Sequence, residues 1–274
     1  QSAVVNSTAS CEETAFALVV RRSSICAAAS SSNVARLRTP AIDRVVLLGA
    51  LCRRSAGLTV CLLALCLSWM RCAAVHAQEP ATWPDPTRYE TTIAAFEAAD
   101  AVSMPAPRGI LAIGSSSIGA WHGTIERDLS PFVIIPRGFG GSVMNDVLHY
   151  VDRVVLPYRP NAILLYEGDN DVSRGISPDS IRVCFEALVA RVHSALPETR
   201  FYVLSVKPSA SRWHLWPQME RVNQVLLEAC NLDSRLIYID VASPFLGVDA
   251  RPDSLLFRKD RLHLNSAGYQ VWTA

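Results

Sequence analysis

A run of serines and a carboxylate–histidine pair are the residues of this sequence with the clearest chemical potential. Residues 114–117 are Gly-Ser-Ser-Ser, and Asp260 stands three positions before His263. A serine hydroxyl becomes a useful nucleophile when a base takes its proton. Histidine can be that base, and a carboxylate bound to its other ring nitrogen fixes the tautomer and stabilises the imidazolium. A separation of three residues lets Asp260 reach the His263 ring on one helical turn or tight loop.

Each feature also has a plainer interpretation, which the spacing alone leaves open. Serine is a favoured helix cap, so a serine run by itself more often caps a helix than attacks a substrate. A D-x-x-H sequence is common at the start of a surface helix. The remaining histidines are interpreted as signal, surface or core residues: His76, His122, His149, His193 and His214.

Two glycine-bearing turns could supply the hydrogen-bond donors that acyl transfer needs. The tetrahedral intermediate carries an oxyanion, which preorganised donors stabilise. Gly141 can bring its backbone N–H close because it has no side chain, and Asn170 can add a side-chain amide. The plain alternatives are ordinary turns. A nucleotide-binding G-x-G-x-x-G loop fails at Val143, and the spacing of a calcium loop is missing around residues 169–171.

Alternating strands and helices are needed to bring these residues together, and the sequence predicts them. Five short apolar runs have the character of buried strands, namely Gly109–Ile113, Phe132–Ile135, Ala162–Tyr166, Phe201–Val206 and Leu236–Val241. Segments of helical period lead or separate them, namely Thr87–Ala101, Asn145–Val155, Ser180–Leu196 and Pro217–Asn231. This alternation predicts a three-layer α/β/α sandwich with a five-stranded parallel sheet, a flavodoxin-like arrangement. Ligands of such sheets bind beyond the carboxyl ends of the strands, where the glycine motifs fall.

The first 77 residues differ in composition from the rest of the chain. They are rich in arginine, poor in acids, and hold every cysteine except Cys184 and Cys230. The sequence divides into an unstructured or mis-assigned extension at 1–52, a signal peptide at 53–77, a linker at 78–86 and the main domain at 87–274, whose last helix is expected to be cut short.

The signal peptide is predicted from three adjoining features. Arg53-Arg54 precede an apolar run at residues 56–70, and Val75-His76-Ala77 places small residues at −3 and −1 of a cleavage site. The expected location is therefore periplasmic or extracellular. An uncleaved membrane anchor is the alternative, although the run is shorter than the ~20 residues that span a bilayer.

Composition and cysteine placement restrict the kinds of partner, metal site and disulfide that the sequence predicts. Half of the residues are hydrophobic and the formal net charge is +1, which gives no indication of a nucleic-acid partner. Neither CxxC nor HExxH occurs, so no metal is predicted. Cys184 and Cys230 lie on apolar stripes of predicted helices, which favours two buried free thiols, although export would permit a disulfide.

Four blocks in a fixed order resemble the SGNH hydrolases, also called the GDSL esterase/lipase superfamily. They are Gly114-Ser115-Ser116-Ser117, Gly140-Gly141-Ser142, Gly168-Asp169-Asn170-Asp171 and Asp260-Arg261-Leu262-His263, and the resemblance runs from about Gly109 to the end. It implies a cofactor-free serine esterase. The sequence departs from the family pattern at Ser115 and Ser142, where aspartate is usual.

The resemblance also assigns roles, with the first block aligned on Gly114 and Trp121. The implied residues are the nucleophile Ser116, the base His263, the orienting carboxylate Asp260, and an oxyanion hole made by the Ser116 N–H, the Gly141 N–H and the Asn170 amide. Ser117 is the nucleophile if the register is shifted by one.

The expected substrate is a small-molecule or carbohydrate ester with a short acyl group, and a sugar O-acetyl group is one candidate. Trp121, Trp213 and Trp216 are candidates to line its binding site, with packing on the sheet edge as the alternative for the last two. An acyltransferase acting on carbohydrate, or an idle carbohydrate-binding module of the same fold, remains open. We expect no stable membrane insertion after signal cleavage, and the oligomeric state is left open.

Overall fold

The computed structural model describes residues 82–274. The predicted extension 1–52, the signal peptide 53–77 and the linker up to residue 81 lie outside the described residues. Within residues 82–274, no helix is long and apolar enough to cross a membrane.

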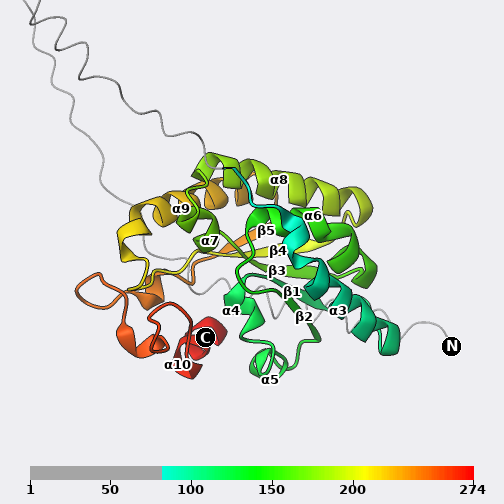
Figure 1. Cartoon of the computed structure of the whole chain (residues 1–274), viewed down its shortest axis with the longest axis horizontal. Helices are drawn as coiled ribbons and strands as arrows, with labels where there is room; N and C mark the ends of the chain where they lie inside the picture. The colour runs from blue at the N-terminus through cyan, green and yellow to red at the C-terminus, as the bar shows by residue number, and fades with distance from the viewer. Residues whose placement is uncertain (1–81) are drawn as a thin grey trace, which may run out of the picture. The chain divides into compact units, whose positions relative to one another are not determined.

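A five-stranded parallel sheet forms the centre of this part of the chain (Figure 1). The strand order is β2-β1-β3-β4-β5, with β1 at Ile110–Gly114, β2 at Ile134–Gly138, β3 at Ala162–Tyr166, β4 at Arg200–Leu204 and β5 at Leu236–Ile239. The predicted fold class is confirmed. This order leaves β1 and β3 side by side at the middle of the sheet, so their carboxyl ends form one shared edge.

Helices cover both faces of the sheet (Figure 1). One face carries α3 (Glu90–Val102), α6 (Met144–Val154), α8 (Pro178–Ala195) and α9 (Trp216–Cys230), and α8 packs against both α6 and α9. The other face carries α4 (Ser116–Gly119), α5 (Ile125–Asp128) and α10 (Ser266–Thr273). The short α7 (Asp169–Ser173) follows β3, and 3-10 turns lie at Pro86–Tyr89 (η2), Leu156–Tyr158 (η3), Trp213–Leu215 (η4), Ser243–Phe245 (η5) and Ser254–Leu256 (η6).

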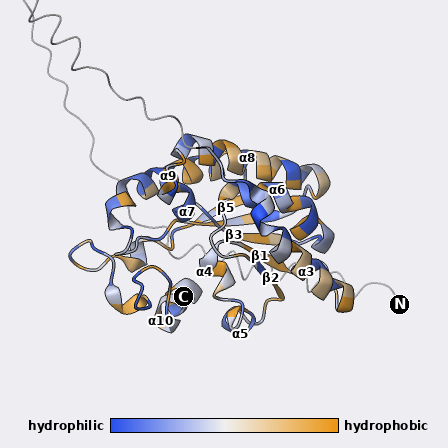
Figure 2. Ribbon diagram, viewed as in Figure 1, coloured by the Kyte–Doolittle hydropathy of each residue, from blue (hydrophilic) through white to orange (hydrophobic). Residues whose placement is uncertain are grey.

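The two-residue period of a strand divides the core between the two faces. In β1, Leu111 and Ile113 enter the cluster under α6 and α8, whereas Ala112 joins the cluster under α4 and α10. Figure 2 shows hydrophobic colour on the strands and mixed colour on the outer helices. Both faces of the strands are therefore buried, which explains why they are nearly continuous apolar runs in the sequence.

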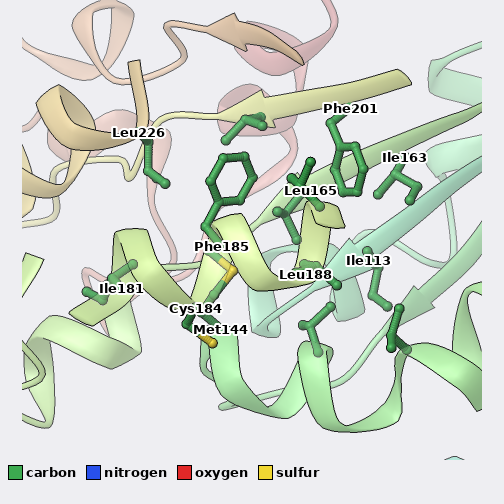
Figure 3. Packing of buried hydrophobic residues seen from close by; sticks show 14 of the residues in the cluster. Ile113, Met144, Ile163, Leu165, Ile181, Cys184, Phe185, Leu188, Phe201 and Leu226 are labelled. Carbon is green, nitrogen blue, oxygen red and sulfur yellow. The ribbon is translucent and has the colours of Figure 1, made fainter. Parts of the chain in front are cut away.

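The two cysteines of the described region are free and buried. Cys184 packs among Met144, Ile181 and Phe185 in the larger cluster (Figure 3). Burial raises the pKa of both thiols to about 12. They behave as small core side chains, as the apolar stripes of their helices predicted.

The β2 prediction was shifted along the chain. Phe132–Ile135 was expected, but the strand begins at Ile134 because Ile134 pairs with Ile110 and Gly138 with Gly114. The Phe132 N–H is instead bonded to Leu129 O in the preceding turn. Pro136 interrupts the apolar run and is tolerated because β2 is an edge strand with one unpaired side. The buried Arg137 is tolerated because it forms an ion pair with Asp100 and its Nε donates to the Tyr158 hydroxyl at 2.6 Å.

Candidate active site

The candidate site lies at the carboxyl edge of β1, β2 and β3. Gly114 ends β1 at φ +136°, and a Cβ added there would lie 2.1 Å from Tyr166 O on β3. A glycine is therefore required for the two central strands to approach where α4 begins. The Ser115 N–H donates to Tyr166 O at 3.1 Å, and the Phe139 N–H donates to Gly114 O at 2.9 Å. These bonds join the first block to the strand that precedes the third block and to the residue that precedes the second block.

The structure brings Ser116, His263 and Asp260 into one hydrogen-bonded chain. His263 Nε2 lies 3.0 Å from Ser116 Oγ, and His263 Nδ1 lies 2.8 Å from Asp260 Oδ2. The neighbouring Ser115 and Ser117 are 0% and 1% exposed, and within residues 82–274 neither hydroxyl is bonded to a histidine. Of the three serines, Ser116 is the one placed to pass its proton to a histidine.

A tight turn fixes the orientation of the Asp260 carboxylate. Asp260 Oδ1 accepts from the backbone N–H groups of Leu262 and His263, both at 3.0 Å. The Leu262 N–H, followed by the His263 side chain, holds the pKa of the Asp260 carboxyl well below its usual range. Asp260 is therefore ionised wherever the protein is folded near neutral pH. It cannot turn away from His263 without breaking both backbone hydrogen bonds.

Three hydrogen-bond donors are available close to Ser116. Among residues 82–274, no partner is found for the backbone N–H of Ser116 or of Gly141. The Asn170 amide donates one of its two N–H bonds to Ser142 O at 3.0 Å, which leaves the other free. A Cβ added to the adjoining Gly140 would lie 3.7 Å from Ser116 Cβ, so the glycine turn borders the nucleophile.

The Asn170 amide is oriented from both ends. Arg212 donates to Asn170 Oδ1 at 3.0 Å, while Ser142 O accepts from Nδ2. Turning the amide over would set donor against donor and acceptor against acceptor. The arginine in turn lies 3.4 Å from Asp169 Oδ2, which also lies 3.6 Å from Lys207 Nζ. The free N–H of Asn170 is therefore held in one direction.

Sequence reasoning missed this supporting charge cluster. Lys207 and Arg212 lie in the loop after β4, far from Asn170 in sequence, and nothing in their spacing marks them. Lys207 has a side chain only 1% exposed, and burial lowers its pKa. A lysine directly after the apolar run of β4 was the only available signal.

Two buried carboxyl groups stand beneath the site with shifted acidities. Glu167, 1% exposed, accepts a hydrogen bond from the Ser142 hydroxyl, and its other oxygen has no hydrogen-bond partner among residues 82–274. Burial, and then the nearby Asp171, raises the Glu167 pKa well above its usual range. Burial also raises the pKa of Asp171 to about 7. Glu167 therefore stays protonated in the folded protein at pH values where the unfolded chain has lost that proton.

We expect this difference to make stability fall as pH rises. Because the folded pKa of Glu167 lies above the unfolded one, its contribution is complete below the ordinary glutamate range and is lost as pH rises through the folded pKa. Glu167→Gln resembles the protonated acid and should flatten the decline of Tm between pH 5 and pH 9. Asp171 contributes in the same direction, so the slope should shrink rather than vanish. Thermal unfolding across this range, with the exposed Glu126→Gln as control, checks the prediction. Parallel curves for wild type and Glu167→Gln would contradict it.

The tryptophan prediction was wrong for two of the three residues. Trp121 is 1% exposed, because its ring stacks on Tyr269 and its Nε1–H donates to Asp128 at 2.9 Å. Trp216 is 9% exposed and packs in the core as the first residue of α9. Neither can offer a face to a substrate. Trp213 is half-buried and stacks on Trp216 at 5.9 Å between ring centroids.

Other chemical groups add no second centre in this region. In the part of the chain from residue 82 onward, no three His, Cys, Asp or Glu side chains gather so that they could hold a metal ion.

The arrangement matches known proteins in family and in fold. The model of the GDSL-like lipase/acylhydrolase family matches residues 111–271, more than half of the chain. Among curated proteins, no sequence matched.

Solved structures share the fold. A Streptococcus pneumonia protein whose description names platelet activating factor is 20% identical, with 79% of this chain and 95% of that chain covered and a TM-score of 0.60. A GDSL-like lipase from Bacteroides thetaiotaomicron is 17% identical, with 69% and 93% covered and a TM-score of 0.54. An acetylxylan esterase from Geobacillus stearothermophilus is 13% identical, with 62% and 92% covered and a TM-score of 0.50. The family match confirms the resemblance seen in the four blocks: this chain belongs to the GDSL-like lipase/acylhydrolase family and is an ester hydrolase.

Proposed function

We propose that the protein hydrolyses short-chain acyl esters through an acyl-serine intermediate formed on Ser116. The observation that carries the proposal is the continuous chain from Ser116 Oγ to His263 Nε2 at 3.0 Å and from His263 Nδ1 to Asp260 Oδ2 at 2.8 Å. This order of nucleophile, base and carboxylate is the one that activates a serine.

In the first half of the reaction, Ser116 Oγ forms a bond to the ester carbonyl carbon while its proton passes to His263 Nε2. The Ser116 N–H, the Gly141 N–H and the free Asn170 N–H stabilise the resulting oxyanion. Asp260 stabilises the imidazolium without taking its proton. The intermediate collapses when the bond to the alcohol oxygen breaks, and that oxygen takes the proton from His263.

In the second half, water replaces the alcohol. His263 removes a proton from water as the hydroxyl oxygen attacks the acyl carbon, and the same proton returns to Ser116 Oγ when the acid leaves. Without an alcohol acceptor the net reaction is hydrolysis. A bound sugar hydroxyl in place of water would make the same residues an acyltransferase.

The acyl-serine step is tested by pre-steady-state kinetics. With p-nitrophenyl acetate, we expect a burst of p-nitrophenol approaching one equivalent of enzyme, and an acid-quenched protein heavier by one acetyl group. A linear onset with no acetylated protein under any quench would argue against a covalent route. Repeating the assay with sugar acceptors, and measuring acetylated sugar against acetate, separates transferase from hydrolase. An idle binding module would give neither product.

We expect activity to favour acetyl to butyryl esters. The side chains of His263 and Asp260 are 29% and 48% exposed, which supports a shallow site open to solvent. Such a site buries little alkyl chain, and each methylene that is fully buried contributes only ~0.8 kcal/mol. A panel of p-nitrophenyl esters of rising chain length should therefore give its highest kcat/KM at two to four carbons. A steady rise towards long chains would favour a lipase with a deep acyl site.

The more specific part of this proposal is that the substrate carries an acetyl group on a sugar. With Trp121 and Trp216 buried, its support among the predicted aromatic residues is reduced to the half-buried ring of Trp213. The fold does accommodate such chemistry, since an acetylxylan esterase shares it. We also propose export, from residues 53–77 alone, and N-terminal sequencing of secreted protein should find Gln78 first.

A further inference from the structure

Tyr89 contacts the Gly140–Gly141 turn, which carries one of the proposed oxyanion donors. It lies in a part of the chain that precedes the residues matched by the family model. It ends η2, and its hydroxyl donates to Gly140 O at 3.0 Å. Its ring meets Phe139 edge-on, with centroids 5.0 Å apart. A Cβ added to Gly141 would lie 3.2 Å from the Tyr89 hydroxyl, so the tyrosine covers this peptide closely.

The hydroxyl controls more than the carbonyl that it touches. The peptide between Gly140 and Gly141 is planar and trans, so the Gly140 C=O and the Gly141 N–H point in opposite directions. Fixing the carbonyl towards Tyr89 therefore fixes the N–H away from it. That N–H is one of the donors proposed to bind the oxyanion.

This peptide needs such a tether because glycine stands on both sides of it. Rotation of a peptide plane changes ψ of the residue before and φ of the residue after, and glycine adopts either sign of φ at little cost. Gly141 has φ +84°. A rotated peptide would present the Gly140 oxygen, an acceptor, where the oxyanion requires a donor. The Tyr89 hydroxyl stabilises one of the two orientations.

The segment that carries Tyr89 is itself anchored. Arg88 forms an ion pair with the fully buried Asp146, whose carboxylate also accepts from the Val143 N–H at 2.9 Å. Tyr150 donates its hydroxyl to Pro86 O at 3.1 Å. The tether therefore starts from a fixed point on α6 and not from a free strand of chain.

We propose that Tyr89 is a positioning residue for the oxyanion hole, acting through the Gly140–Gly141 peptide. This inference rests on the proposed acyl-transfer function of the site. It assigns a role to a residue outside the four sequence blocks and outside residues 111–271 of the family match.

The test compares Tyr89→Phe with Thr199→Val. Each substitution deletes one hydroxyl that donates to a backbone carbonyl, and the Thr199 hydroxyl donates to Pro160 O at 2.8 Å near the amino ends of the strands, outside the site. Loss of a whole oxyanion donor costs about 10²–10³ in kcat, so a donor that is only misoriented part of the time should cost roughly 10-fold. We expect Tyr89→Phe to lower kcat on p-nitrophenyl acetate by that factor, with KM and Tm close to wild type. Thr199→Val should retain wild-type kcat.

Two further measurements separate positioning from other roles. A boronic acid, which forms a tetrahedral anion on the serine, should bind Tyr89→Phe weaker by the same factor as the loss in kcat. The rate of fluorophosphonate labelling should fall in parallel, and it needs the nucleophile and the donors but no turnover. This rate tests Tyr89 even if acetate is not the acyl group, so failure of the proposed substrate and failure of this inference are distinguishable.

Three results would overturn the inference. One is a Tyr89→Phe variant with unchanged kcat and labelling rate. Another is an equal loss in both variants, which would make the effect a general consequence of losing a hydroxyl group. The third is a raised KM at constant kcat, which would make Tyr89 a substrate-contacting residue.

Discussion

Ser116→Ala should lower kcat by about 10⁴-fold or more while leaving the protein folded, as removal of a triad member does. The hydroxyl is the only group of Ser116 that the substitution removes, and it contacts His263 Nε2 at 3.0 Å. The backbone N–H at this position survives in alanine, so the proposed oxyanion donor is retained. Hydrolysis of p-nitrophenyl acetate, together with circular dichroism and Tm, measures both halves of the expectation.

Ser115→Ala and Ser117→Ala are the matched controls for this prediction. Each removes a buried hydroxyl that is not bonded to His263 and keeps the backbone N–H and C=O groups of its position. Both should keep kcat within a few-fold of wild type. Mapping a fluorophosphonate adduct by mass spectrometry provides an independent measurement. An adduct on Ser115 or Ser117 would identify that serine as the nucleophile and would contradict the role of Ser116.

Local patterns explain why much of the fold could be predicted. The β3 run Ala162–Tyr166 was predicted with the boundaries it has, because every one of its residues is buried and apolar. Asp260 and His263 are close in sequence, so one turn settles their contact. Gly114 has a backbone that tolerates no side chain, which is why a glycine marks the end of β1.

Long-range packing explains the failures. Tryptophan is a residue type typical of ligand-binding sites, so the sequence made Trp121 a candidate. Its ring contacts with Tyr269 and Trp272 in α10 show that it belongs to the hydrophobic core. Arg212 and Tyr89 contact motifs that are distant in sequence, and no periodicity of the sequence links either residue to the motif that it contacts. Residues that orient a site without reacting are defined by tertiary contacts. A single sequence therefore identifies the reacting groups more readily than the residues that orient them.

Asp260→Asn should also reduce kcat by about 10⁴-fold, and here the loss comes from the tautomer of His263. Asp260 Oδ1 accepts from two backbone N–H groups, of Leu262 and His263. In asparagine that position must stay the oxygen, because an NH₂ group would face both donors. The NH₂ then points at His263 Nδ1 and requires it to be an acceptor. His263 Nε2 consequently carries the proton and cannot take one from Ser116.

Asp240→Asn is the control that separates this mechanism from a general effect of charge removal. Asp240 Oδ1 likewise accepts from two backbone N–H groups, of Ala242 at 2.9 Å and Ser243 at 3.0 Å, but its other oxygen accepts from the Ser243 hydroxyl and not from a histidine. A hydroxyl can reverse its donor and acceptor roles, so this variant should keep its activity. Both variants should retain Tm within a few degrees, since each keeps the two backbone hydrogen bonds of its turn. If Asp260→Asn retained more than about a tenth of wild-type kcat, His263 would not depend on Asp260 for its tautomer, and another group would have to orient the ring.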